Sequence, residues 1–139
     1  MDLFYHGCMI INLWINPSFF LPYLAQTCSP HHVLITDGNE NSTENLEIVI
    51  SENKRLGLIE PDKVSSRLVK WANGSKDLKM DYDVIICADC LFFDEGRPQL
   101  LECLKKALRG GGTAIIVAPS RSGTFEVISK KISSLRWPY

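Results

Sequence analysis

The apolar residues of this chain gather in short runs that are separated by turn-forming and charged residues. Val33–Thr36 is a β-branched run that ends at the turn and cap residues Asp37-Gly38-Asn39, which predicts a strand. A helix is expected from about Ser42 to about Arg55, because apolar residues there recur three and four positions apart (Leu46, Val49 and Ile50). Gly57 stands where a C-cap glycine would end this helix.

Two further strands are predicted in the middle of the chain. The first runs from about Val64 to Trp71 and is closed by the turn Asn73-Gly74-Ser75. The second, Val84–Cys87, belongs to the segment Asp81–Phe93 and is an uninterrupted apolar run. Such runs are typical of a strand that is covered on both faces in a parallel sheet.

The third quarter of the chain predicts a helix from about Pro98 to Leu108, whose proline suits the first helical position. Its apolar stripe consists of Leu100, Leu101, Leu104, Ala107 and Leu108. Gly110-Gly111-Gly112 is interpreted as a turn, because a phosphate-binding loop would precede a helix and these glycines precede a predicted strand, Thr113–Ala118. A last helix is expected at Gly123–Leu135.

The resulting order, β-α-β-β-α-β-α, predicts an α/β protein with a doubly wound, mostly parallel sheet and right-handed crossovers. The 139 residues allow one domain. In such sheets ligands bind beyond the carboxyl ends of the strands, so Asp37, Trp71 and Asp89 are expected on one rim.

Composition narrows the class of protein. Residues 1–96 carry seven Lys/Arg against fourteen Asp/Glu, whereas residues 97–139 carry eight against two. The basic part could face an acidic partner, although a solvated helix face is the more ordinary explanation. Five cysteines without a disulfide framework indicate an intracellular protein, and Cys87 and Cys90 are interpreted as buried thiols with no metal. The apolar stretch Cys8–Leu24 is too interrupted to predict a membrane span.

Each rim residue allows a functional and a structural interpretation. Asp37 can accept both ribose hydroxyls of a nucleoside-containing cofactor, but Asp-Gly is also an ordinary turn. Trp71 can cover an adenine ring or simply pack on the sheet. Asp89 can orient the reacting end of a ligand or be a structural strand-end residue.

Three segments carry a family resemblance: VLITDGN, SSRLVKW and the stretch from DYDVIICADCLFF to APSR. From about His32 to about Lys131 the chain resembles the seven-strand S-adenosylmethionine-dependent methyltransferases, and is most similar to the calmodulin-lysine N-methyltransferases of the protein-lysine branch. The resemblance implies that Asp37 binds the cofactor ribose, that Trp71 binds its adenine, and that Ala88 belongs to the same cofactor site. It also implies that Asp89 and Phe92 line the methyl-transfer and lysine-entry region.

The chain also departs from this family. No Gly-x-Gly precedes Val33, so the glycine-rich loop after the family's first strand is missing. We expect residues 1–31 to be a divergent N-terminal segment and residues 32–139 to be a partial methyltransferase domain. Met9–Ile15 is expected to fill the place of the first strand without rebuilding the loop; the alternative is that the segment is disordered, with no folded role.

The functional expectation is therefore a protein-lysine N-methyltransferase that uses S-adenosylmethionine and acts on calmodulin or a similar acidic protein. The alternative is a truncated, non-catalytic member or interaction module of that family, and we expect little or no activity from this chain. A nicotinamide-dependent oxidoreductase is disfavoured, because its Gly-x-Gly-x-x-Gly turn is absent from the sequence. We expect a cytoplasmic location, with the nucleus left open, and neither nucleic acid nor membrane as a partner.

Overall fold

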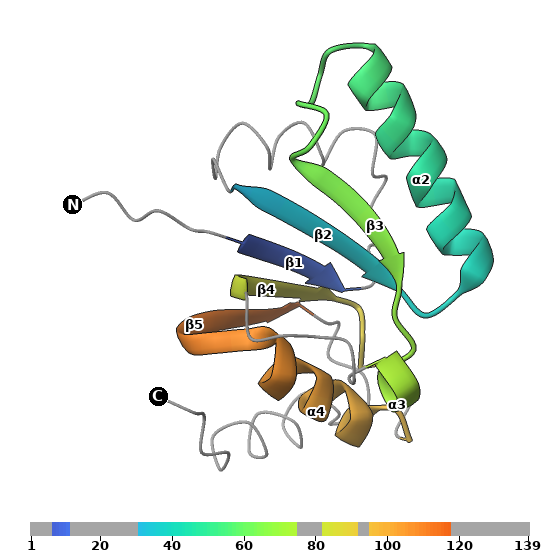
Figure 1. The fold of residues 1–139 in the computed structure, drawn as a ribbon. Coiled ribbons are helices and arrows are strands. Elements are labelled where there is room, and N and C mark those ends of the chain that lie inside the picture. The colour runs from blue at the N-terminus through green and yellow to red at the C-terminus, as the bar shows by residue number, and fades with distance from the viewer. Residues whose placement is uncertain (1–6, 12–30, 75–81, 92–94, 118–139) are drawn as a thin grey trace.

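The computed structural model describes residues 7–11, 31–74, 82–91 and 95–117. Five strands form one parallel sheet in the order β3-β2-β1-β4-β5, and their arrows point to one edge (Figure 1). The strands are β1 Gly7–Ile11, β2 His32–Asp37, β3 Val64–Leu68, β4 Tyr82–Ala88 and β5 Leu108–Val117. The helices are α2 Glu40–Arg55, α3 Trp71–Gly74 and α4 Arg97–Ala107.

Strand β1 occupies the centre of the sheet. Its residues pair in parallel with β2 on one side and with β4 on the other, so that Ile11 faces both Thr36 and Cys87. Met9–Ile11 thus lie in the position that the sequence analysis assigned to Met9–Ile15, and this pairing satisfies backbone groups that two buried strand edges would otherwise expose. Residues 12–15 of that segment lie outside the described residues, and the division into residues 1–31 and 32–139 stays a prediction.

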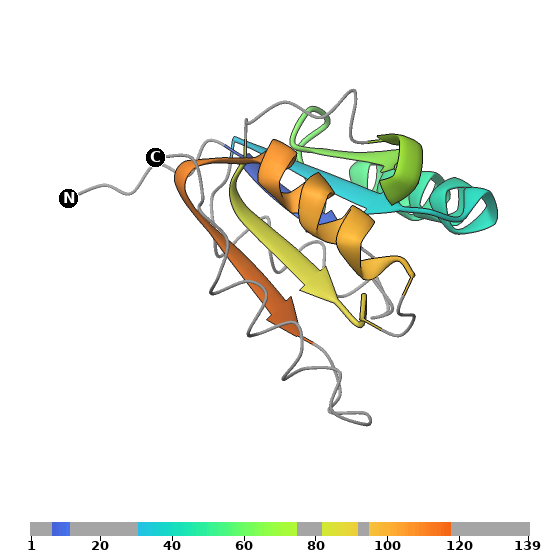
Figure 2. The same cartoon turned by 90° about the horizontal axis from the view of Figure 1, so that it is seen from below.

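Helices α2 and α4 cover opposite faces of the sheet, as the doubly wound prediction requires (Figure 2). One apolar cluster joins α2 to β2 and β3 through Leu46, Ile50, Val33, Ile35 and Val64. The other joins α4 to β4 through Leu100, Leu104, Ala107, Ile85 and Cys87. Alternate residues of β4 serve different clusters, which confirms that this strand is covered on both faces.

The ends of α2 show how the sequence sets its length. Asn39 is the N-cap, and its Oδ1 accepts a hydrogen bond from the Ser42 N–H at 3.1 Å. The helix therefore begins two residues before the predicted Ser42. At the other end Gly57 has φ +71°, and the N–H groups of Gly57 and Leu58 donate to the carbonyl oxygens of Lys54 and Asn53. This Schellman arrangement confirms the role predicted for Gly57.

Strand β3 is shorter than predicted. It ends at Leu68 instead of Trp71, and Trp71 begins α3, so Asn73 and Gly74 belong to a helical turn. The predicted strand is too long because Val69 is apolar and is buried as a strand residue would be, with 3% of its surface exposed. Its side chain packs into the α4 cluster, and apolar periodicity alone does not separate this from a continuing strand.

The triple glycine was wrongly predicted as a turn before a strand. α4 ends at Ala107, Leu108 is already extended, and Gly110–Gly112 lie within β5. The register shifts there, since Tyr82 pairs with Leu108 but Val84 pairs with Thr113, so the glycines form a bulge. Gly111 has φ +77°, and a Cβ on Gly112 would lie 2.9 Å from the Asp83 carbonyl oxygen. Glycine is thus required by the bulge.

Two further predictions concern the helices. Pro98 is the second helical residue of α4, not the first, because the helix begins at Arg97 after the N-cap Gly96. The predicted helix Gly123–Leu135 lies outside the described residues. Among the described helices, none combines the length and apolar character needed to cross a membrane.

Candidate functional site

The carboxyl ends of β2, β1 and β4 form the rim on which the candidate residues were expected. Because Ile11 pairs with both Thr36 and Cys87, the next residues, Asp37 and Ala88, stand level with each other across β1. Two strand spacings separate them, about 10 Å. The predicted rim is therefore present, with β1 between its two sides.

A pocket of about 450 Å³ opens on the β2 side of this rim. Its walls come from the β2–α2 connection, the segment that leads into α3, and the beginning of α4; the lining residues are Asp37, Gly38, Asn39, Val69, Lys70, Trp71, Ala72, Glu95, Gly96 and Gln99. The volume lies within the range of ordinary small-molecule sites. Asp37 and Trp71, predicted separately from the sequence, are brought together here.

Asp37 is held by local backbone contacts. Its Oδ1 accepts a hydrogen bond from the Asn39 N–H at 2.8 Å, which forms a turn before α2. Its carbonyl oxygen accepts the Val69 N–H, also at 2.8 Å. The turn uses Oδ1, and the carboxylate still has a second oxygen that can accept a ligand hydroxyl. The structural and functional interpretations of Asp37 are thus compatible.

Trp71 is half-buried and packs against the α4 cluster. The Val69–Asp37 bond places the residues before it beside the end of β2, and α3 packs against α4. Glu40 and Lys70 form an exposed ion pair at 3.3 Å that joins the start of α2 to the same segment. Such an exposed pair contributes little free energy, so the wall is held mainly by the packing of Trp71 and by the Val69–Asp37 hydrogen bond.

The other predicted site residues do not line this pocket. Ala88, which was expected in the cofactor site, and Asp89, which was expected at the methyl-transfer region, both lie at the end of β4 away from the pocket lining, and Phe92 lies outside the described residues. Asp89 is half-buried with φ +49°, and its N–H donates to the Val117 carbonyl oxygen at 2.8 Å. A non-glycine residue in this left-handed region is uncommon, although aspartate is enriched there, and such residues often occur at functional sites.

Arg97 stabilises the chain just after Asp89. It is only 9% exposed, and its Nε and Nη2 donate to the Leu91 carbonyl oxygen at 3.3 and 3.2 Å. A cation at the first position of a helix is unfavourable with respect to the helix dipole. The double donation to the Leu91 carbonyl oxygen, in the segment that follows β4, offsets this cost.

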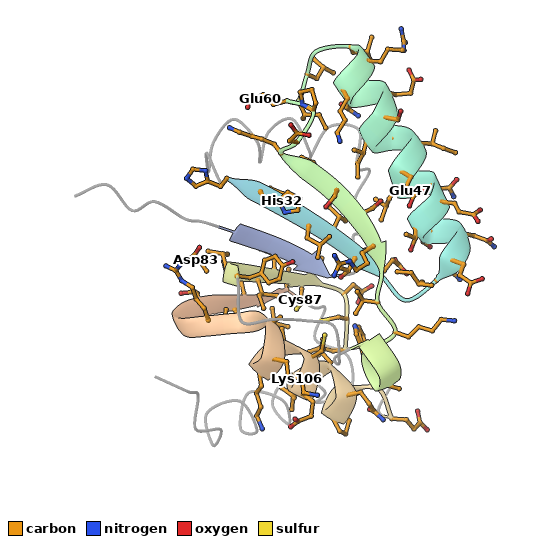
Figure 3. The ribbon with its side chains drawn as sticks, viewed as in Figure 1. His32, Glu47, Glu60, Asp83, Cys87 and Lys106 are labelled. Atoms are coloured by element: carbon orange, nitrogen blue, oxygen red, sulfur yellow. The ribbon has the colours of Figure 1, made fainter. Side chains whose placement is uncertain are left out.

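Cys87, Cys90 and Cys103 are free thiols that are completely buried in the α4 cluster, to which α4 itself contributes Cys103 (Figure 3 marks Cys87 on β4). A hydrogen bond with Cys90, together with burial, raises the pKa of the Cys87 thiol, and the same bond lowers the pKa of Cys90. Burial raises the pKa of Cys103 to about 11. The predicted burial of Cys87 and Cys90 is confirmed. Within the described ranges, no three His, Cys, Asp or Glu residues group as metal ligands would.

Gln99 is a polar pocket residue that was not predicted from the sequence. It occupies the first turn of α4, next to Leu100 of the apolar stripe. A helix that follows a parallel strand begins at the ligand-binding rim. A polar residue in the first turn of such a helix is therefore the sequence signal that would have indicated Gln99 as a pocket residue.

Comparison with solved structures defines the class of fold. An S-adenosyl-L-methionine-dependent methyltransferase candidate from Methanococcus maripaludis has a TM-score of 0.63 at 18% identity, covering 94% of this chain and 56% of that one. Spermidine synthase from Thermotoga maritima has a TM-score of 0.61 at 20% identity, covering 93% of this chain and 43% of that one. These likenesses show a Rossmann-like methyltransferase fold, and the chain spans about half the length of the proteins it matches.

Residues 11–132 match the model of the lysine methyltransferase family. The chain belongs to this family. The match begins at Ile11, the end of β1, whereas the sequence resemblance begins at about His32; the family match therefore includes most of the N-terminal segment.

Proposed function

We propose that the pocket binds the nucleoside part of S-adenosylmethionine. Asp37 accepts hydrogen bonds from the ribose hydroxyls, and Trp71 covers one face of the adenine. The observation that carries this proposal is that an acidic residue at the end of β2 and an aromatic residue after β3 line one pocket of suitable volume. A carboxylate that is already oriented by a turn is well suited to a diol, because its second oxygen is pre-positioned.

The reaction we propose is methylation of a lysine amine on an acidic protein such as calmodulin. When bound, S-adenosylmethionine supplies a methyl group made electrophilic by the sulfonium. Asp89, on the far side of β1 from Asp37, holds the lysine nitrogen, and Phe92 is assigned to the lysine-entry region. The chain's contribution is alignment of the amine and exclusion of water. Family membership and the basic character of residues 97–139 support this choice.

A non-catalytic binding protein of the same family is the second candidate. Residues 12–31, which connect β1 to β2, contain no glycine. A backbone that must approach the methionine part of the cofactor closely needs glycine, because a Cβ would occupy the space. The nucleoside half of the site is thus suited to the cofactor, whereas this connection favours weak binding and little turnover.

Isothermal titration calorimetry of the full chain with S-adenosylmethionine tests the proposal, and S-adenosylhomocysteine tests binding without the methyl group. Saturable binding in the micromolar range is expected if the pocket accepts the whole cofactor. Binding without methyl transfer to calmodulin would support the non-catalytic candidate. No heat at millimolar cofactor would exclude both the cofactor assignment and catalysis.

A further inference from the structure

Gln99 carries a buried polar atom that the fold does not use. Its Oε1 is inaccessible to solvent and has no hydrogen-bond partner among the residues that the structure describes. A buried carbonyl oxygen without a donor is destabilising, and such atoms are rare in native proteins. This atom belongs to a residue that lines the proposed cofactor pocket.

A purely structural role for this side chain would be helix capping. Gln99 is the third residue of α4, a position from which glutamine can reach back to the N-cap N–H of Gly96 in a capping box. In that role Oε1 would accept the hydrogen bond, yet no such bond is formed. Oε1 therefore has no donor within the described part of the protein, and the pocket that Gln99 lines is the adjacent space from which a ligand can supply one.

The arrangement of the pocket walls orients a bound nucleoside. α3, which begins with Trp71, packs against α4 on one side, and the bond between Val69 and Asp37 ties its approach to the end of β2 on the other (Figure 1). A nucleoside whose base covers Trp71 and whose ribose meets Asp37 therefore directs the outer edge of the base toward α4 and Gln99.

Building on the proposed function, we propose that Gln99 determines base specificity: its Oε1 accepts a hydrogen bond from the exocyclic N6 amine of adenine. A glutamine amide matches the donor and acceptor pattern of adenine. The terminal torsion of glutamine is broad, so the amide turns Oε1 toward the pocket at little cost. Binding then supplies the donor that Oε1 lacks in the free protein.

Calorimetry tests this with S-adenosylhomocysteine and its analogue in which hydrogen replaces the N6 amine. The wild-type chain should bind the parent compound about tenfold more tightly than the analogue, the scale of one hydrogen bond. Gln99→Met should reduce this ratio to within about threefold, because the acceptor is gone. Gln99→Glu, which keeps an acceptor, and Glu102→Met, on the exposed side of α4, should preserve it.

Thermal unfolding of the free proteins provides a second readout. Gln99→Met should be at least as stable as the wild type, since no hydrogen bond of Oε1 is lost; a clear loss of stability would indicate a structural role instead. If Gln99→Met retains the full preference for the parent compound, the base-specificity proposal is wrong while the cofactor site stands. If the wild type binds neither compound, both proposals are wrong.

Discussion

The carbonyl oxygen of Asp37 accepts a 2.8 Å hydrogen bond from the backbone N–H of Val69, one residue beyond the end of β3. This bond prolongs the pairing of β2 and β3 past the last strand residue. It brings the segment that carries Trp71 to the residue that ends β2, and the two side chains thereby share one pocket.

Asp37→Ala should weaken binding of S-adenosylhomocysteine by about 1.5–3 kcal/mol, the scale of hydrogen bonds to a charged group. Asp37→Asn is the matched control, because its amide oxygen can still accept the Asn39 N–H and keep the turn. Calorimetry on both variants separates the ligand contact from the turn. Unchanged affinity in Asp37→Ala would mean that this residue serves the turn alone.

Trp71→Ala should lower cofactor affinity by about 1–3 kcal/mol, the cost of losing an aromatic surface beneath a base. Trp71→Phe keeps a ring and should lose less. Since Trp71 also packs on the α4 cluster, urea unfolding of both variants must accompany the titrations. Equal affinity of the alanine variant and the wild type would place the base elsewhere.

Arg97→Met should destabilise the fold by about 1–3 kcal/mol, because the buried Leu91 carbonyl oxygen loses its donors. Arg97→Lys should recover only part, since an ammonium group cannot reproduce the two-nitrogen contact. Denaturant unfolding measures both. Arg55→Met, at an exposed position with an i, i+3 pair, should stay within about 0.5 kcal/mol of the wild type. A similarly small effect at Arg97 would contradict the stabilising role.

Gly112→Ala should cost about 1–3 kcal/mol, because the new Cβ would lie 2.8 Å from Leu108 Cδ1 and 2.9 Å from the Asp83 carbonyl oxygen. Gly38→Ala is the control, since its Cβ would meet the Val69 carbonyl oxygen at an ordinary 3.7 Å. Thermal unfolding compares the two. Equal stability of both variants would show that the bulge adapts without strain.

His32 should make stability depend on pH. Burial, and then the charges of Lys54 and Arg67, lower the pKa of His32 below its ordinary value near 6.5. His32 therefore binds a proton more readily in the unfolded chain than in the folded one. The stability that comes from keeping His32 neutral is fully present above about pH 6.5 and is lost as the pH falls through the lowered pKa. Unfolding midpoints between pH 7.5 and 5.5 should decline less in His32→Gln than in the wild type. An identical decline would contradict the assignment.

Much of the architecture could be predicted from local patterns. Asn39 and Gly57 limit α2 through their own caps, and the stripe of α4 is buried as its spacing required. The limit of β3 could not be predicted this way, because Val69 is buried by contacts with α4 that are remote in sequence. The bulge of β5 likewise depends on the Asp83 carbonyl oxygen of the neighbouring strand.

The sequence by itself determined the order of strands β2 to β5 with helices α2 and α4, the placement of Asp37, Trp71 and Asp89 at or beyond strand ends, and the family, because caps, periodicity and motifs are local properties of the chain. Only the tertiary structure decided that β1 separates Asp37 from Asp89, that Trp71 shares a pocket with Asp37, and that Gln99 lines the same pocket with an Oε1 that has no hydrogen-bond partner among the described residues. The physical reason is that strand pairing and helix packing bring together groups whose distance along the chain carries no signal of their proximity.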